Sequence, residues 1–445
     1  MKKRIIISLL VSTTLLNAMS LDETIEKALL HNNSLKQISL DVEESKANRT
    51  AKKAQNFGRI DLIANYDHYN NARTLSPLTP MDIVGGTDGA YKIPTTNDLV
   101  TAGVAYNVVL FNGFAQQNAY KISDVLYKNS IIKSKLGHEE LIYNVRSLYL
   151  SLLSLDEQLQ AQKAYSKAQY DLYRKIESAY EIGSKSKLDT LKAKNAYEAS
   201  LSNEQKIQAN IEILRATLTS LIGGEEFGSE EAVVIDIAAK KDNTLESVDS
   251  LNRYRLYQLK SDIATKKLDS SYASYYPKVD FSSYYGYSMG PNATTNTSPI
   301  THKTYLDKGD FNNETIWQVG IHLKWSLYDF GSRSANVQKE KLALMSAKLD
   351  EADVKLEIDK NLKVAKSKLL LAKANFNAAQ SQYELLHEIV RVESVKYDND
   401  AVTLTDLLDY KAQEKLAYSK MISSKYEFQK AQYYIDYLLE RGEKK

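Results

Sequence analysis

The clearest candidates for a functional site in this sequence are two carboxylates, Asp406 and Asp409, in the stretch TDLLDY. A spacing of three residues places both side chains on one face of a helix. Rings of carboxylates in a pore select cations and can bind a blocking metal ion. The structural alternative is that these residues lie near the start of a helix, where the dipole stabilises negative charge by about 0.3–1 kcal/mol.

Enzymatic chemistry finds little support elsewhere in the chain. There is no Cys and no G-x-S-x-G motif to supply a nucleophile. The pair Gly223-Gly224 does not belong to a phosphate-binding loop and indicates the end of a helix. We expect no enzymatic activity, no cofactor and no metal centre. The six histidines are scattered without metal-ligand spacing (His31, His68, His138, His302, His322 and His387).

The N-terminus has the features of a secretory signal peptide. Residues 2–4 are basic, an apolar run extends to Leu16, and Ala18 and Ser20 are small residues at the −3 and −1 positions of a cleavage site. We predict that residues 1–20 form a signal peptide, removed after about Ser20. The alternative is a buried N-terminal helix.

The composition of the remaining chain excludes several classes of partner. Charged residues make up 26% and the mean hydropathy is −0.41, with no later run of about 18 apolar residues, so no membrane-spanning helix is expected. Removal of residues 2–4 lowers the basic count from 58 to 55, against 56 acidic residues. Near-neutral charge argues against a nucleic-acid partner, and the lack of Cys excludes a lipid anchor on cysteine.

The chain contains a tandem repeat of one unit. Asp189 and Asp406 are 217 positions apart, and the same offset relates Tyr180 to Tyr397. The predicted domains are a first repeat at 21–224, a linker at 225–244 and a second repeat at 245–445.

Each repeat is expected to contain a helix, two strands around a loop, a long helix and a shorter helix. All six prolines fall in the strand-loop regions. The other parts of each repeat can therefore form uninterrupted helices. A helix of about 65 residues would be roughly 100 Å long. The predicted helices are 21–55, 115–182, 246–274 and 332–398, and the predicted strands are 59–69, 99–111, 278–287 and 317–327.

Two apolar stripes on the long helices step four and three residues in turn, as coiled-coil seams do. The alternative is the core stripe of a soluble helical bundle. The stripes are Leu141, Val145, Leu148, Leu152, Leu155 and Leu159, and Ile358, Leu362, Ala365, Leu369, Ala372 and Phe376.

The predicted strands alternate apolar and polar residues, as strands of an outer-membrane β-barrel do. In the stretch 317–327, Trp317 and Trp325 lie eight residues apart on the apolar face and are candidates for the aromatic girdle. A small soluble sheet is the alternative. Four strands do not close a membrane barrel, and open edges in lipid are costly. Several chains must therefore share a barrel, with eight strands from two chains or twelve from three.

Taken together, the sequence resembles the TolC family of outer-membrane efflux channels over nearly the whole chain after the signal peptide. The resemblance is carried by LDETIEKAL from Leu21, LFNG from Leu110, YEIG from Tyr180, LYDFG from Leu327 and TDLLDY from Thr405. The order and duplication of these elements are more specific than any one of them.

The resemblance implies an α+β membrane protein in which a homotrimer forms a twelve-stranded β-barrel, continued by a long α-helical barrel into the periplasm. It implies a passive exit duct in the outer membrane of a Gram-negative bacterium. The partners would be outer-membrane lipid, a periplasmic adaptor (membrane fusion protein) and an inner-membrane RND, ABC or MFS pump, in drug efflux or type I secretion. The competing hypothesis is a periplasmic coiled-coil scaffold protein of the cell envelope.

The resemblance also assigns roles to residues of the predicted periplasmic tip. It places Asp406 and Asp409 at the constriction, and Asp189 and Tyr397 in the gate that holds the tip shut. The turns expected to dock the adaptor are Ile182, Gly183, Ser184 and Lys185, and Asn399, Asp400, Ala401 and Val402.

The sequence departs from the family pattern at this gate. Val402 stands where an arginine would form a charged lock with Asp189, and Asp400 replaces a turn glycine. Lys185 and Lys187 are the candidates to replace the arginine.

Overall fold

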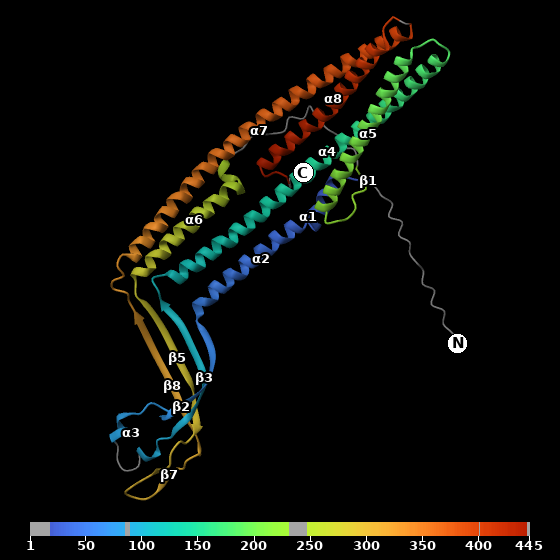
Figure 1. Ribbon diagram of the computed structural model, residues 1–445. Helices are drawn as coiled ribbons and strands as arrows, with labels where there is room; N and C mark the ends of the chain where they lie inside the picture. The colour runs from blue at the N-terminus through green and yellow to red at the C-terminus, as the bar shows by residue number, and fades with distance from the viewer. Residues whose placement is uncertain (1–17, 85–89, 231–246, 400, 443–445) are drawn as a thin grey trace, which may run out of the picture. The chain divides into compact units, whose positions relative to one another are not determined.

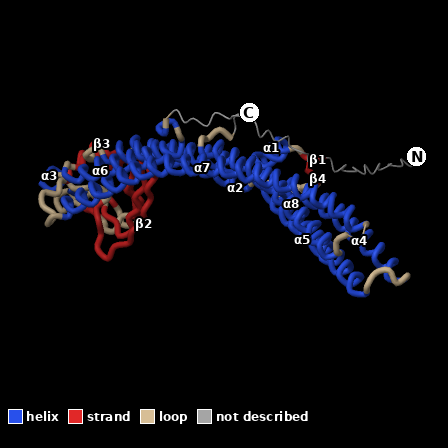
Figure 2. Tube along the Cα trace, turned by 90° about the horizontal axis from the view of Figure 1, so that it is seen from above, coloured by secondary structure: helices blue, strands red, loops and turns tan. Residues whose placement is uncertain are grey.

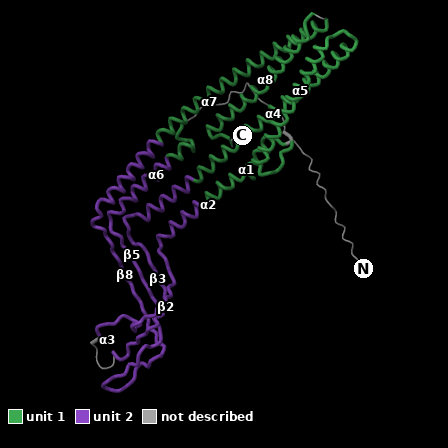
Figure 3. Tube along the Cα trace, viewed as in Figure 1, with its two compact units in different colours: residues 1–42, 130–257, 351–445 green, residues 43–129, 258–350 purple. Residues whose placement is uncertain are grey.

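The computed structural model describes residues 18–84, 90–230, 247–399 and 401–442. The chain divides into two compact units (Figure 3). Unit 1 contains residues 1–42, 130–257 and 351–445, and unit 2 contains residues 43–129 and 258–350. Helices α2, α4, α6 and α7 contribute residues to both units. Among the described residues no helix is long and apolar enough to cross a membrane.

Most of the described chain is helical (Figure 2). Two helices of 67 residues dominate, one in each repeat. The α-helices are α1 (Leu21–His31), α2 (Asn33–Ala54), α3 (Pro80–Val84), α4 (Ala115–Glu181), α5 (Lys187–Leu221), α6 (Asn252–Tyr272), α7 (Ser332–Asp398) and α8 (Leu404–Leu438). The short 3-10 turns are Gln55–Phe57, Ala90–Lys92, Val248–Ser250 and Ala273–Tyr275.

Unit 2 contains a four-stranded antiparallel sheet with the order β2-β3-β5-β8 (Figure 1). Its strands are β2 (Arg59–Thr74), β3 (Thr95–Phe111), β5 (Lys278–Pro291) and β8 (Phe311–Lys324). The short strands β1 (Ala18–Met19) and β4 (Ser229–Glu230) pair in parallel, and β6 (Asn296–Thr297) pairs with β7 (Thr304–Leu306).

The order of elements predicted from the sequence is confirmed, and the second long helix has the predicted bounds. Several boundaries were wrong. The first long helix ends at Glu181, and helix α6 spans Asn252–Tyr272 and not 246–274. Strand β2 extends to Thr74, β3 begins at Thr95 and β5 extends to Pro291. The last strand spans Phe311–Lys324, so that Trp325 lies just beyond it. The indole Nε1 of Trp325 donates to the carbonyl of Tyr275 at 3.1 Å.

The prediction of a single helix at 21–55 was also wrong, because Asn32 divides it into α1 and α2. The backbone of Asn32 is extended (φ −61°, ψ 121°). Its Nδ2 donates to the carbonyl of Leu221 at 3.1 Å, and its Oδ1 accepts from the N–H of Leu35 at 3.1 Å. The side chain of Asn32 therefore accepts a hydrogen bond from an N–H group in the first turn of α2 and also links α2 to the end of α5.

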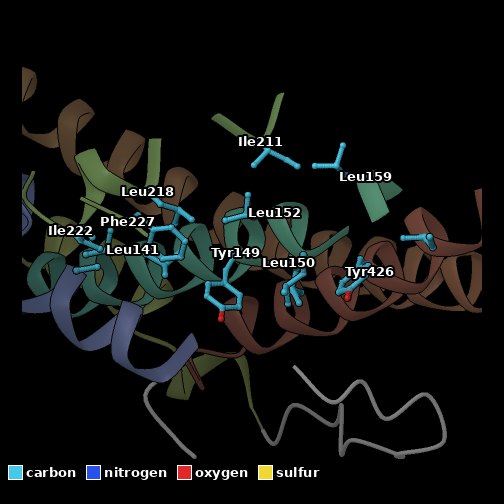
Figure 4. Close-up of a cluster of buried hydrophobic side chains, with 14 of the residues drawn as sticks. Leu141, Tyr149, Leu150, Leu152, Leu159, Ile211, Leu218, Ile222, Phe227 and Tyr426 are labelled. Carbon is cyan, nitrogen blue, oxygen red and sulfur yellow. The ribbon is translucent and has the colours of Figure 1, made fainter. Parts of the chain in front are cut away.

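The predicted apolar stripe of α4 forms the main core of unit 1 (Figure 4). Four of its members are at most 7% exposed, and Leu148 and Leu155 pack against them. Residues from other elements complete this core, including Leu218, Ile222, Phe227 and Tyr426. In the stripe of α7, Leu362, Ala365 and Phe376 are buried.

One apolar face of strand β8 is left uncovered by the described residues. Trp317, Val319, Ile321 and Leu323 alternate along it and are between 60% and 71% exposed. Since β2 and β8 are the two edges of the sheet, the sheet formed by the described strands has both an uncovered apolar face and unpaired backbone edges. Such a sheet is incomplete as an isolated structure.

The junctions between strand and helix differ between the two repeats. In the first, the Oδ1 of Asn112 accepts from the N–H of Gln116 at 3.3 Å. In the second, an Oδ2 of Asp329 accepts from the N–H of Arg333 at 2.8 Å and from its Nε at 3.0 Å. Both carry one glycine and one phenylalanine at positive φ, in opposite order: Gly113-Phe114 and Phe330-Gly331.

A similar divergence occurs at the end of the last helix of each repeat. Gly223 has φ +87°, and a Cβ there would lie 2.6 Å from the Cβ of His31. At the equivalent position Glu440 adopts φ +54°. Its two carboxylate oxygens accept from the N–H groups of Asn252 and Arg253 at 2.7 and 2.9 Å. The carboxylate of Glu440 therefore accepts hydrogen bonds from the first N–H groups of α6, while the backbone of Glu440 itself adopts an unfavourable left-handed conformation.

Substitution of Glu440 is expected to separate these two effects. Glu440→Ala should lower the free energy of unfolding by about 1–3 kcal/mol, because two N–H groups lose a charged acceptor. Glu440→Gly should cost less, because glycine tolerates the positive φ. Thermal unfolding of the purified protein measures both. A glycine variant less stable than the alanine variant would contradict this account.

Candidate functional site at the helical tips

The predicted tip consists of the ends of two helical hairpins, α4–α5 and α7–α8, and both of these ends lie in unit 1. Helix α4 ends at Glu181 and is followed by Gly183 at φ +77°. The N–H of Ser184 donates to the carbonyl of Ala179 at 2.8 Å, which is the Schellman arrangement. In the second hairpin the N–H of Ala401 donates to the carbonyl of Lys396 at 2.9 Å. The predicted docking residue Asp400 lies outside the described residues.

Asp189 and Asp406 have the same local role at the starts of α5 and α8. The Oδ2 of Asp406 accepts from the hydroxyl of Thr403 at 2.6 Å and from its N–H at 3.2 Å. The Oδ2 of Asp189 accepts from the hydroxyl and the N–H of Ser186 at 2.8 and 3.3 Å. Each pair is a reciprocal capping box. The spacing of Ser or Thr three residues before the acid could have identified both boxes from the sequence.

The two predicted constriction residues are exposed on the first turns of α8. Asp409 accepts a hydrogen bond from the Nε2 of Gln413 at 2.8 Å. Leu404 and Leu407 are buried, at 4% and 2% exposure. Helix α8 thus buries its apolar face and leaves both carboxylates on accessible surface, which permits an electrostatic role in addition to capping.

Polar contacts join the two hairpins near their tips. Lys175 pairs with Asp398 at 2.7 Å, and the Nζ of Lys192 donates to the Oγ1 of Thr405 at 3.0 Å. The hydrogen bond and charge of Lys175 lower the pKa of Asp398. A further contact places the Nζ of Lys185 5.1 Å from the ring centroid of Tyr397. Of the two lysines proposed to replace an arginine, Lys185 thus reaches the predicted gate residue Tyr397.

An apolar cluster, here called the tip cluster, lies between the same hairpins. Ile176 of α4 and Leu407 of α8 are both 2% exposed within it. Val402 packs against the cluster, which gives a packing reason for an apolar residue at that position. The buried members are Leu172, Ile176, Ala193, Tyr397, Leu404 and Leu407.

The turns themselves present accessible surface. Ile182 is 82% exposed, and a Cβ added at Gly183 would meet no atom within 4 Å. The side chain of Asn399 donates to the carbonyl of Val395 at 2.7 Å. Ser184 and Ala401 are exposed, and Lys185 and Val402 are partly buried.

A further polar feature lies in unit 1, at a cavity of about 320 Å³ lined by Tyr165, Tyr383, Tyr418, Glu414 and Lys415, with two alanines. The Nζ of Lys415 is buried without a hydrogen-bond acceptor and lies 5.8 Å from the ring centroid of Tyr418. Burial lowers the pKa of Lys415 from 10.5 to about 8. No motif or spacing in the sequence marks this lysine.

Lys415→Met is therefore expected to stabilise the protein at pH 7, by about 1–2 kcal/mol after allowance for solvent screening. Between pH 8 and 10.5 the folded wild type binds fewer protons than the unfolded chain, so the stability of the wild type rises with pH. The stability advantage of Lys415→Met over the wild type therefore narrows in this range. Unfolding midpoints from pH 7 to 10 measure the effect. The exposed Lys420 supplies the control, since Lys420→Met should change little. If the stability difference between Lys415→Met and the wild type did not change with pH, the lowered pKa of Lys415 would be contradicted.

Within the described residues no group of three or more His, Cys, Asp or Glu side chains is arranged to hold a metal ion.

Comparison with known proteins identifies the fold. The chain is similar to the outer-membrane channel CmeC of Campylobacter jejuni, with a TM-score of 0.79 and 15% identity over 95% of this chain and 86% of CmeC. For the outer-membrane protein VceC of Vibrio cholerae the TM-score is 0.73 and the identity 14%, over 95% of each chain. For the MtrE outer-membrane channel of Neisseria gonorrhoeae the TM-score is 0.72 and the identity 14%, over 95% of this chain and 89% of MtrE. These likenesses establish a TolC-like fold.

A search of curated proteins finds no match. The family model described as outer membrane efflux protein matches residues 24–224 and 257–439. The two matched segments correspond to the two repeats, and together they cover most of the chain. The chain therefore belongs to the outer membrane efflux protein family and has that family's role as an outer-membrane exit duct.

Proposed function

We propose that three copies of this chain close a twelve-stranded barrel in the outer membrane. The observation that carries the proposal is the sheet of unit 2, whose edge strands β2 and β8 have no further partner among the described strands. Its strand β8 exposes Trp317 and three aliphatic residues in alternation. Lipid would cover that face, and pairing of β8 with β2 of the next copy would satisfy both edges. Trp317 and Trp325 are proposed to lie at the membrane interface.

The tips of the helical hairpins are proposed to form the periplasmic gate of this duct. The tip cluster and the contacts of Lys175, Lys185 and Lys192 hold the two hairpins of one copy together. We propose that the turns at 182–185 and 399–402 dock a periplasmic adaptor, which separates the hairpins. An energised inner-membrane RND, ABC or MFS pump would select the substrate, so that the duct itself has no catalytic role.

The proposed constriction consists of Asp406 and Asp409, and it requires a test that separates charge from capping. Asp406→Asn removes a carboxylate and weakens a capping box. Asp189→Asn makes the same chemical change in the equivalent box of the first repeat, so both should cost similar stability, about 1 kcal/mol. Only Asp406→Asn and Asp409→Asn are expected to reduce cation selectivity.

Single-channel recordings in planar bilayers measure this selectivity as a reversal potential in a salt gradient. Wild-type protein extracted with detergent should give small cation-selective currents. The double variant Asp406→Asn/Asp409→Asn should lose most of the selectivity. Equal loss in Asp189→Asn would contradict the constriction, and a water-soluble wild type without current would instead indicate an envelope scaffold.

A further inference from the structure

Met19 is built into the core of unit 1 although it lies within the segment predicted to be removed on export. Its carbonyl accepts a hydrogen bond from the hydroxyl of Tyr149 at 2.7 Å. Tyr149 is fully buried, at 0% exposure, and its ring lies edge-on to Phe227 with centroids 6.2 Å apart. The side chain of Met19 also packs against this core.

Ser20 is an equally integral residue because it is the N-cap of α1. Its hydroxyl accepts from the N–H of Glu23 at 3.2 Å, and its own N–H donates to the carboxylate of Glu23 at 3.0 Å. The carbonyl of Ser20 accepts from the N–H of Thr24 at 3.0 Å and from its hydroxyl at 2.8 Å. Thr24 is fully buried. These bonds fix the first turn of the helix.

The backbone before α1 has a further partner. Ala18 and Met19 form β1, which pairs in parallel with Ser229 and Glu230 of β4. The segment 18–20 is thus attached to the fold by strand pairing, by a buried tyrosine and by a helix cap.

Cleavage after Ser20 would remove all three attachments. The bond from the hydroxyl of Tyr149 to the carbonyl of Met19 would be lost from the core. Helix α1 would begin at Leu21 with a free ammonium, although a positive charge at a helix N-terminus opposes the helix dipole. Cleavage two residues earlier would leave the carbonyl of Met19 and every bond of Ser20 in place.

We propose that export processing cuts the chain between Ala18 and Met19, so that the mature protein begins at Met19. The step is a hydrolysis in which water adds across the amide, leaving a carboxylate on Ala18 and an ammonium on Met19. Ala18 supplies the small side chain required immediately before the cut. Leu16 at the −3 position is larger than the residue of an A-x-A-like site, so the contacts of Met19 and Ser20 carry the assignment. Met19 and Ser20 then anchor the new N-terminus to Tyr149 and Glu23.

N-terminal sequencing and intact mass of the protein purified from cell envelopes test this proposal. A first residue of Met19 is expected. A chain that begins at Leu21, at Met1 or at any other residue overturns it. This readout is independent of the duct function, which the bilayer currents test separately.

Two variants strengthen the test. Ser20→Leu places a large side chain where a cut after residue 20 needs a small one, yet processing should still yield Met19; a block of processing would overturn the proposal. Deletion of Met19 and Ser20 leaves Ala18 directly before Leu21. This chain should unfold roughly 2–4 °C below wild type or lower. An unchanged midpoint would show that the two residues do not anchor the N-terminus.

Discussion

Ile176→Ala should open the proposed periplasmic gate far more than Lys175→Ala, although the two residues are neighbours in α4. Ile176 is 2% exposed in the tip cluster, and its truncation leaves a cavity that costs about 2–5 kcal/mol. Lys175 and Asp398 form an ion pair between side chains that are 66% and 59% exposed, and such exposed pairs contribute little. The tip cluster, and not the ion pair, is thus expected to contribute most of the free energy that holds the two hairpins together.

The expected result is a large increase in single-channel conductance for Ile176→Ala. A loss of about 2 kcal/mol already changes an equilibrium between closed and open tips more than tenfold, and in the proposed trimer the loss occurs in every copy. Ile182→Ala is the matched control, because it is the same substitution in the same hairpin at a side chain that is 82% exposed. Equal opening by the two alanine variants would contradict this role of the tip cluster.

The second large effect is expected at the junction between β8 and α7. The guanidinium of Arg333 donates to the carbonyls of Ser326 and Leu327 at 2.8 and 3.2 Å, in addition to its bonds with Asp329. Burial alone raises the pKa of Asp329, but the hydrogen bonds and charge of Arg333 outweigh it and lower the pKa. Arg333→Gln should destabilise the protein by about 2–4 kcal/mol, since it removes several hydrogen bonds from a side chain only 15% exposed.

Asp329→Asn combined with Arg333→Gln should recover part of this loss, because it removes the carboxylate left without its guanidinium, although the bonds to Ser326 and Leu327 are not restored. The double variant recreates the neutral pair Asn112 and Gln116, which caps α4 at the same position of the first repeat. A double-mutant cycle on unfolding midpoints measures the coupling. Arg59→Gln is the control, because Arg59 pairs with Asp61 through a side chain that is 78% exposed. A double variant less stable than Arg333→Gln alone would contradict the equivalence of the junctions.

The order of elements could be predicted because its signals are local. Proline positions and apolar periodicity separate strands from helices, and a constant offset reveals the duplication. The division at Asn32 could not be predicted in this way. No proline or glycine marks it, and the residue ends a helix because its side chain reaches Leu221, 189 positions away.

The candidate site shows the same division between local and distant causes. The capping boxes of Asp189 and Asp406 follow from residues three positions apart. The packing of Val402, the contact of Lys185 with Tyr397 and the burial of Lys415 depend on which helices meet. Such contacts become visible only when the hairpins are placed side by side.

The duplication has a consequence for how readily the proposed ring assembles. A chain with only one repeat would carry one strand pair and one tip hairpin, and it would need six copies to close the same twelve strands. The fused chain needs three. By mass action, the yield of complete rings then depends on roughly the third power of the concentration of free chains and not on the sixth. Fusion also holds two neighbouring hairpins at a fixed high effective concentration, so that closed rings can form from a sparse supply of exported chains.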